Sequence, residues 1–238
     1  MDMSVSYYCA TGRRENNEDC VSVRESASGL LALVADGLGG HAKGEVASHL
    51  AVSTLNRLLL HREPEENALT DAIEEASRQV HLAQETGNNM KTTIAALWVA
   101  HRRAFAAHVG DSRIYHIRNG RILYQSVDHS VSQMAVMVGE ITLDQIRTHR
   151  DRNKLIRVLG NANAPKVDCE ELELQAGDRL LICSDGFWEP VDENYMCASS
   201  LRFDSAKDWL EDMKQAVLQA NKPNQDNHTA IALVIHQV

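Results

Sequence analysis

The chain lacks the features that mark several common protein classes. Its 238 residues include four prolines and 5% aromatic residues, and no stretch is rich in proline, glycine or serine. No apolar run approaches the roughly 20 residues that a membrane-spanning helix needs, so we expect no membrane insertion. The length suits one hydrophobic core, and we therefore expect residues 1–238 to form a single domain.

Positive charge is scarce relative to negative charge. The chain has 24 lysines and arginines against 33 aspartates and glutamates, which gives a formal net charge of −9. The phosphate backbone of a nucleic acid repels such a surface, so we do not expect nucleic acid to be the main partner. The acidic excess fits a protein whose carboxylates hold cations.

Regularly spaced cysteines are also missing. The five cysteines are odd in number and include no Cys-x-x-Cys pair. This usage indicates free thiols in a reducing compartment rather than a disulfide framework or a zinc site. The N-terminus carries Asp2 and no apolar segment follows it, so we expect no signal peptide and a cytoplasmic location.

Three short apolar runs each end in an aspartate followed by a small residue. Residues 30–35 precede Asp36, residues 104–110 precede Asp111, and residues 180–184 precede Asp185. Such runs predict buried strands. An Asp-Gly pair after one strand usually forms only a turn. However, a charged carboxylate at a buried strand end needs a cation or several donors, and three that meet would form a site for a divalent metal.

Hydrophobic periodicity predicts helices and strands without regular βαβ alternation. The first helix should carry Val46 and Leu55 on its apolar face, and Asn119-Gly120 should form a tight hairpin turn. The pattern indicates an α+β fold, with antiparallel sheets covered by helices. Helices are expected over 42–62, 66–85 and 205–220, and strands over three segments before residue 37 and over 92–100, 104–109, 113–117, 121–125, 167–174, 179–184 and 228–236.

The segment 128–160 has a different character. Helical spacing in its first part is followed by a basic run. We interpret this segment as a flap that meets an anionic substrate, and the alternative is a solvated helical face. The basic run consists of Arg147, His149, Arg150, Arg152, Lys154 and Arg157.

Two further clusters complete the set of strand-end acids. One is Arg14-Glu15-Asn16-Asn17-Glu18-Asp19, and the other is Asp226-Asn227 before the last strand. Two divalent ions held by such carboxylates would share a bridging hydroxide, which can attack phosphorus in line. An arginine beside the ions would bind phosphate oxygens in a bidentate manner, and Arg14 is placed for this task if its strand joins the cluster.

These motifs, taken in order, resemble the bacterial metal-dependent Ser/Thr protein phosphatases of the PPM (protein phosphatase 2C-like) family. The resemblance runs from about Tyr7 to Val234, and residues 128–130 and 138–142 resemble the family's flap. It implies a four-layer α-β-β-α sandwich of two mostly antiparallel sheets flanked by helix pairs, with metals in a cleft at one edge. The motifs are residues 14–19, 34–41, 109–113, 183–186 and 225–229.

The resemblance also implies a set of metal ligands for two Mn²⁺ or Mg²⁺ ions. Asp36 would bridge the ions, and Asp111 together with Asp185 matches the position of a third, weaker ion in bacterial members. Gly37 would contribute its backbone carbonyl. The full set of implied ligands is Glu18, Asp36, Gly37, Asp111, Asp185 and Asp226.

The remaining catalytic roles follow from the same resemblance. Arg14 would bind the substrate phosphate, and Asp19 would orient metal-bound water, so that Arg14, Asp19 and Asp36 are the expected catalytic residues. Eukaryotic members carry a histidine two residues after the bridging aspartate, where this chain has Leu38. The general acid is then His41 or a metal-bound water, and we favour the water.

The implied substrates are proteins phosphorylated on serine or threonine, and the implied counterpart is a Ser/Thr kinase. The sequence of residues 185–189 is also similar to members encoded with type VI secretion systems. We expect a monomer. The alternative to an enzyme is an inactive phosphatase-like domain that binds phosphoproteins as a scaffold, but a lost metal ligand should mark such a domain.

Two other enzyme classes fit less well. Residues 37–42 match the dinucleotide-binding pattern G-x-G-x-x-A, but Asp36 stands where a pyrophosphate would be repelled and no acidic strand end follows about 20 residues later. A cysteine-nucleophile phosphatase needs an arginine six positions after the cysteine. The residues at that spacing are Glu15, Ser26, Gln175, Glu189 and Phe203, which excludes this mechanism.

Overall fold

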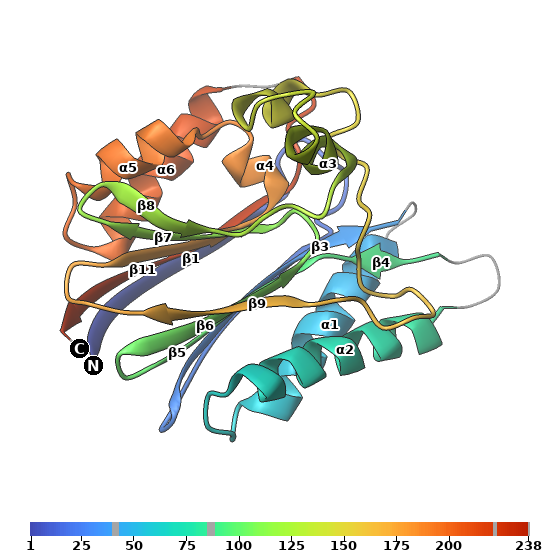
Figure 1. The fold of residues 1–238 in the computed structure, drawn as a ribbon, viewed down its shortest axis with the longest axis horizontal. Helices are drawn as coiled ribbons and strands as arrows, with labels where there is room; N and C mark the ends of the chain where they lie inside the picture. Colours follow the sequence, from blue (N-terminus) through green and yellow to red (C-terminus); the bar gives the residue numbers. More distant parts are fainter. Residues whose placement is uncertain (40–42, 85–88, 221–222, 238) are drawn as a thin grey trace.

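The computed structural model describes residues 1–39, 43–84, 89–220 and 223–237 (Figure 1). The helices are α1 (Lys43–Leu59), α2 (Glu66–Leu82), α3 (Val131–Met137), the 3₁₀ helix η1 (Asp144–Thr148), α4 (Asp185–Trp188), α5 (Glu193–Ser200) and α6 (Ala206–Gln219). The strands are β1 (Asp2–Ala10), β2 (Asp19–Ser26), β3 (Gly29–Leu38), β4 (Lys91–Thr92), β5 (Ile94–Ala100), β6 (Arg103–Val109), β7 (Arg113–Arg118), β8 (Arg121–Gln125), β9 (Asp168–Glu173), β10 (Arg179–Cys183) and β11 (His228–Gln237).

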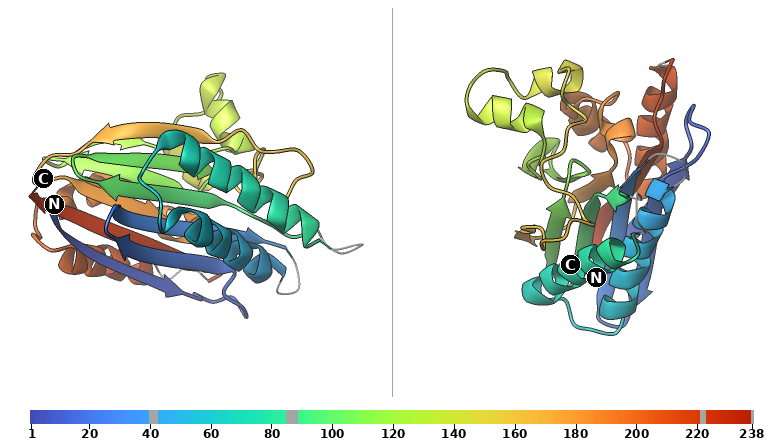
Figure 2. Two further views of the ribbon diagram at one scale, coloured as in Figure 1. Left: turned by 90° about the horizontal axis from the view of Figure 1, so that it is seen from below. Right: turned by 90° about the vertical axis from the view of Figure 1, so that its right-hand side faces the viewer.

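Two sheets stack face to face between layers of helices (Figure 1). One sheet has the strand order β1-β11-β10-β7-β8, and the other has the order β2-β3-β5-β6-β9 with β4 paired to β3. The strand pairs within both sheets are antiparallel. Figure 2 shows α1 and α2 lying across the second sheet. The predicted four-layer α-β-β-α sandwich is confirmed.

Strand β3 contributes side chains to two hydrophobic cores, one on each face of its sheet. Its residues Leu30, Ala32 and Val34 face the core between the sheets. The alternate residues Leu31, Leu33 and Ala35 face the core beneath α1 and α2. Because successive side chains of a strand point to opposite faces, a continuous apolar run is what a strand covered on both sides requires.

Several boundaries differ from the sequence prediction for identifiable reasons. The helix α1 turns Ala47, Ala51, Leu55 and Leu59 toward the sheet, whereas Val46 is 53% exposed, so its predicted place on the apolar face was wrong. The helix α5 was not predicted, because two of its three buried residues, Ser199 and Ser200, are polar and leave no apolar stripe in the sequence. The hairpin at residues 119–120 is confirmed, with φ values of 50° and 68°.

The segment 128–160 forms α3, η1 and an irregular return. It is joined to the second sheet's edge by a bridge between Thr92 and Leu159 and is closed on itself by a bridge between Ser130 and Leu155. Figure 2 shows it projecting beyond the ends of the strands. Within the part of the chain that the structure describes, no helix is long and apolar enough to cross a membrane.

Candidate active site

The strand ends that carry the predicted acids meet at one edge of the sandwich. Asp19 at the start of β2 pairs in register with Asp36 near the end of β3. In the other sheet Cys183 pairs with both Arg113 and Ala230, which brings the neighbouring loops together. A cavity of about 430 Å³ at this edge is lined by seven of the eight predicted site residues: Arg14, Glu18, Asp36, Gly37, Asp111, Asp185 and Asp226.

The eighth predicted residue, Asp19, lies beneath the cavity and is 3% exposed. Ser184 Oγ donates a hydrogen bond of 2.8 Å to its Oδ2. Its other oxygen, Oδ1, is buried without a hydrogen-bond partner in the described structure. Burial raises the pKa of Asp19 to about 7 despite the hydrogen bond from Ser184.

The pKa values of Asp36, Asp111 and Asp185 are raised as well. Burial raises the pKa of Asp36 well above its usual range, and the neighbouring charges of Asp19 and Asp185 raise it further. The pKa of Asp185 is also raised well above its usual range, by burial and then by the charges of Asp111 and Asp226. Burial raises the pKa of Asp111 to about 7. The fold therefore places several carboxyl groups close together in a buried position, which disfavours their charged forms.

A divalent cation is the group that fits this arrangement. Asp185 Oδ1, like Asp19 Oδ1, is buried without a partner in the described structure. Unpaired carboxylate oxygens in a buried position are costly unless a cation neutralises them. Hard cations such as Mg²⁺ and Mn²⁺ bind oxygen ligands of this kind. The donor set is rich in oxygen and, within the described lining, holds no cysteine or histidine.

The backbone of Asp36 is fixed from both sides by threonines. Thr93 Oγ1 accepts a hydrogen bond of 2.9 Å from the Asp36 amide, and Thr92 Oγ1 donates one of 2.9 Å to the Asp36 carbonyl. Thr93 Oγ1 also lies 2.8 Å from Ser112 Oγ, beside Asp111. The single strand predicted over 92–100 is interrupted at Thr93, which separates β4 from β5.

Glu18 and Gly37 are held together by a close approach of backbone. The Gly37 amide donates to the Glu18 carbonyl at 3.1 Å, and Ser48 Oγ donates to the same carbonyl at 2.7 Å. A Cβ on Gly37 would lie 2.2 Å from Gly44 O, and one on Gly44 would lie 2.8 Å from Glu18 Cδ. Both positions therefore require glycine.

Arg14 and Asp226 form the mouth of the cavity. Arg14 Nη2 lies 2.7 Å from Asp226 Oδ2, and the arginine side chain is 54% exposed. The hydrogen bond to Asp226 raises the pKa of Arg14, so the guanidinium is permanently charged. It is thus the cation of the described lining that an entering phosphate would meet.

Comparison with known proteins identifies the family. Residues 10–234 match the sequence model of the family described as Protein phosphatase 2C. The chain belongs to the protein phosphatase 2C family. A serine/threonine phosphatase named stp from Listeria welshimeri is 36% identical over 193 residues, which are 77% of this chain and 77% of that protein. Together these findings make the protein a serine/threonine phosphatase, as its motifs predicted.

Solved structures of phosphatases share the fold over nearly the whole chain. The catalytic domain of the serine/threonine protein phosphatase PstP in complex with 2 manganese ions aligns with a TM-score of 0.82 at 29% identity, covering 99% of this chain and 100% of that chain. PppA, described as a key regulatory component of T6SS in Pseudomonas aeruginosa, aligns with a TM-score of 0.81 at 25% identity, covering 98% of each chain.

The basic run of this phosphatase is not a patch of free cations. Arg147 Nη2 lies 2.7 Å from Glu193, Arg152 Nε lies 2.7 Å from Glu189, and Arg157 Nη1 lies 3.0 Å from Asp168. Asp151 pairs with both Arg150 and Lys154. Asn153 and Leu155 of the same segment line the cavity, and Arg152 lines an adjoining cavity that shares Arg14, Asp185 and Asp226 with it.

Sequence reasoning missed the polar side chains that hold the acids in place. Asn227 Oδ1 accepts from the Glu18 amide at 2.8 Å, while its Nδ2 donates to the carbonyls of Thr11 and Asn16. Trp188 Nε1 donates to the Asp111 carbonyl at 2.9 Å. Ser184 and Asn227 stand beside predicted ligands in the motifs, which was the available signal. The alternative general acid, His41, lies outside the described residues.

Proposed function

We propose that this protein hydrolyses phosphoserine and phosphothreonine in proteins by a metal-dependent reaction without a phosphoenzyme. The observation that carries the proposal is the convergence of five acidic segments on one cavity, with buried oxygens of Asp19 and Asp185 that lack partners. A site that binds only a phosphate would not gather negative charge in this way.

We assign the cations to the carboxylates that line the cavity. Asp36, whose pKa is raised by burial and then by the neighbouring charges of Asp19 and Asp185, would be the ligand shared by the ions. Two Mn²⁺ or Mg²⁺ ions are proposed, and the manganese-containing relative supports this assignment. A third, weaker ion would use Asp111 with Asp185. The proposed ligands are Glu18, Asp36, the Gly37 carbonyl, Asp111, Asp185 and Asp226.

The chain's own residues would bind and orient the substrate. When bound, the ions supply an activated water for direct attack on phosphorus and neutralise charge on the phosphoryl group. Arg14 is proposed to leave Asp226 and hold two phosphate oxygens with its planar fork. Asp19, fixed by Ser184, accepts a hydrogen bond from the attacking water when ionised. Leu38 lines the cavity and cannot donate a proton, so the leaving alkoxide needs another donor, for which we favour water over His41.

We further propose that residues 1–238 act as one monomeric catalytic domain with residues 128–160 as its flap. A Ser/Thr kinase is the expected counterpart, because it produces the phosphoproteins that the site would hydrolyse. The likeness to PppA supports a role alongside type VI secretion. The described cysteines are all free thiols, which supports a reducing, cytoplasmic location.

The proposal is tested by phosphate release from a phosphothreonine peptide with Mn²⁺ and with EDTA. Wild-type protein should require the metal, and Asp185→Asn should lose at least 100-fold in kcat/KM because it removes a charged ligand. Glu171→Gln, which changes an exposed acid on β9, is the matched control and should keep wild-type activity. Metal-independent hydrolysis would contradict the proposal.

The competing candidate is an inactive phosphatase-like domain that binds phosphoproteins. It is disfavoured because all the predicted ligands are present and, apart from Asp19 beneath it, the predicted site residues line one cavity. Folded protein that releases no phosphate under Mn²⁺, yet retains a phosphothreonine peptide on a column, would establish this alternative.

A further inference from the structure

His129 hydrogen-bonds both backbone polar groups of Gly110, in the loop that carries Asp111. The backbone amide of His129 donates to the Gly110 carbonyl at 2.9 Å. The Gly110 amide in turn donates to His129 Nδ1 at 3.1 Å. One residue thus satisfies both the amide and the carbonyl of Gly110, directly before the proposed metal ligand Asp111.

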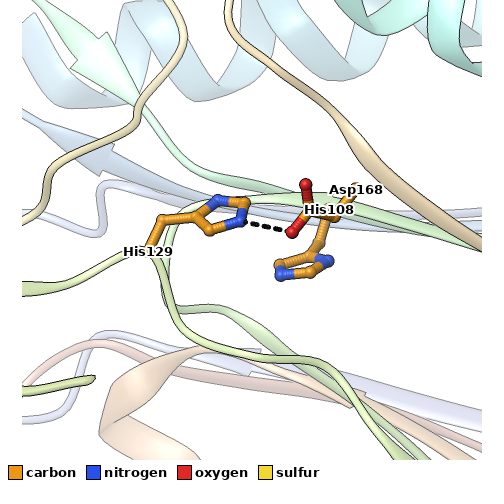
Figure 3. A group of neighbouring side chains, drawn as sticks. All are labelled: His108, His129 and Asp168. Atoms are coloured by element: carbon orange, nitrogen blue, oxygen red, sulfur yellow. Dashed lines mark hydrogen bonds and ion pairs between the residues drawn. The ribbon is translucent and has the colours of Figure 1, made fainter. Parts of the chain in front are cut away.

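The tautomer of His129 follows from these contacts. An amide is always a donor, so Nδ1 must be the unprotonated nitrogen and Nε2 must carry the hydrogen. Nε2 lies 3.1 Å from Asp168 Oδ2 and donates to it (Figure 3). Burial lowers the pKa of His129 to about 4, which agrees with a neutral ring whose Nδ1 is free to accept.

His108, His129 and Asp168 could also be interpreted as a second metal site. His108, His129 and Asp168 each offer a ligand-type atom, and these atoms lie within 4.8 Å of one another (Figure 3). However, a metal bound at His129 Nε2 would require a proton on Nδ1, which would then face the Gly110 N–H. Arg157 Nη1 also lies 3.0 Å from both His129 Nε2 and Asp168 Oδ1. The guanidinium already neutralises the carboxylate, so a metal does not fit.

His108 supports the ring of His129 from one face. The two imidazoles stack with centroids 4.6 Å apart and an interplanar angle of 15°. His108 Nε2 lies 2.9 Å from the Val127 carbonyl, to which it donates. This stack and the bond to Asp168 fix the plane of His129 and hence the direction of its Nδ1 lone pair.

Gly110 leads directly to the active site. Its φ of +113° and the 2.6 Å approach of a hypothetical Cβ to Thr93 leave no alternative residue there. Thr93 binds the Asp36 amide and touches Ser112, so the loop 110–112 packs against the support of Asp36. On the other side, the amide of Ile156 donates to the His129 carbonyl at 2.8 Å, which joins the flap's return to the same residue.

We propose that His129 is a positioning residue that holds Gly110, and through it Asp111, in the geometry needed for metal binding, with Asp168 and Arg157 as its anchor. The inference rests on the proposed function for its readout in activity. It makes one prediction that does not depend on activity, which is the protection of the Gly110 amide.

Two conservative variants of His129 each keep one of the two hydrogen bonds that its imidazole ring makes and remove the other. In His129→Asn the side-chain Oδ1 can replace Nδ1 as acceptor for Gly110, but the link to Asp168 is lost. In His129→Gln the side-chain Nε2 can replace the ring's Nε2–H as donor to Asp168, but the acceptor for Gly110 is lost. Hydrogen exchange of the Gly110 amide should accelerate at least tenfold in His129→Gln and stay within threefold of wild type in His129→Asn.

The Mn²⁺ concentration for half-maximal phosphate release should follow the same order. It should rise about tenfold in His129→Gln and at most threefold in His129→Asn, and the His129→Gln effect should vanish in an Asp111→Asn background. Equal effects of the two variants on amide exchange, with equal losses of melting temperature, would show a merely structural role and overturn the proposal.

A larger effect of His129→Asn, with a matching loss of Mn²⁺ binding in Asp168→Asn, would establish the metal site instead. If wild-type protein releases no phosphate, the proposed function fails while amide exchange still decides the role of His129.

Discussion

Arg113 and Asp128 form a buried, bidentate ion pair next to the proposed metal centre. The Nε–Oδ1 and Nη2–Oδ2 distances are 2.8 and 2.7 Å, and the side chains are 3% and 2% exposed. The Arg113 guanidinium also lies 3.5 Å from the centroid of the Trp188 ring. Since Trp188 binds the Asp111 carbonyl, the pair supports the site from beneath.

The first prediction concerns this pair. Asp128→Asn should lower the free energy of unfolding by about 3 kcal/mol, because it leaves the Arg113 charge buried with a weaker partner. Urea unfolding at pH 7 measures the change. Glu171→Gln breaks the exposed pair with Arg103, whose side chains are 46% and 60% exposed respectively, and should change stability by less than about 0.5 kcal/mol. Equal costs for the two variants would contradict the argument.

The second prediction concerns the pH dependence of stability without metal. Asp19 and Asp111 have pKa values raised to about 7, so the folded protein binds more protons than the unfolded chain. Their contribution to stability is present below the unfolded pKa near 3.8 and is lost as the pH rises through about 7. In EDTA, these two groups should therefore lower the free energy of unfolding by about 1.5 kcal/mol between pH 6.5 and pH 8, as the last part of a loss that begins near pH 3.8.

Between pH 6.5 and pH 8 the change in stability reports on the carboxyl groups rather than on His129. His129 has a folded pKa lowered to about 4, so its opposing contribution changes only between about pH 4 and 6.5. Mn²⁺ should abolish the fall, since it binds the ionised carboxylates of the native state. Asp111→Asn should show a smaller fall than wild type in EDTA. Stability that rises with pH in EDTA would contradict the assignment.

The features of this site that could be predicted from the sequence are those that depend on neighbouring residues or on strand pairing. The apolar runs before Asp36, Asp111 and Asp185 identify strands, and antiparallel pairing then brings their ends to one edge. The two acids Asp19 and Asp36 are even in register. These features are local in sequence or follow from the pairing of strands, so they could be predicted.

The polar side chains that hold the acids in place could not be predicted, because their partners are far away in the sequence. Ser184 reaches Asp19 across 165 positions, and Asn227 reaches Glu18 across 209. No periodicity relates such residues. The pairing of the basic run could not be predicted for the same reason, since the partners that neutralise Arg147 and Arg152 are Glu193 and Glu189 on a different segment. The sequence shows the charges but not their pairing.

The third prediction tests the backbone approach at Glu18. Gly44→Ala would place a Cβ 2.8 Å from Glu18 Cδ and 2.7 Å from the Gly37 carbonyl carbon, so the carboxylate must move. The Mn²⁺ concentration for half-maximal activity should rise at least tenfold, with a loss of about 1–3 kcal/mol in stability.

A second glycine separates displacement of Glu18 from a general loss of stability. Gly177 has a φ of +89°, and no described atom outside its chain neighbours lies within 4 Å of the place that a Cβ would take, so Gly177→Ala introduces backbone strain alone. It should cost about 1–2 kcal/mol and leave the Mn²⁺ requirement unchanged. An unchanged Mn²⁺ requirement in Gly44→Ala would remove Glu18 from the proposed ligand set.

The fourth prediction assigns Arg14 to the phosphate rather than to the metal. Arg14→Ala should reduce kcat/KM for a phosphothreonine peptide about 100-fold, and Arg14→Lys should recover only part of this loss, because an ammonium cannot hold two phosphate oxygens in a fork. Stability should change by less than about 0.5 kcal/mol, since the Arg14 side chain is 54% exposed. Arg103→Ala, on the exposed start of β6, is the control and should keep wild-type kinetics.

The Mn²⁺ concentration required for activity distinguishes the role of Arg14 from that of Asp226. Arg14 Nη2 occupies Asp226 Oδ2 at 2.7 Å, so removing the guanidinium frees an oxygen that a cation can use. Arg14→Ala should therefore leave the Mn²⁺ requirement unchanged or lower it, whereas Asp226→Asn should raise it at least tenfold. If Arg14→Ala raised the Mn²⁺ requirement while KM stayed constant, the arginine would support the metal site and the phosphate would be bound elsewhere.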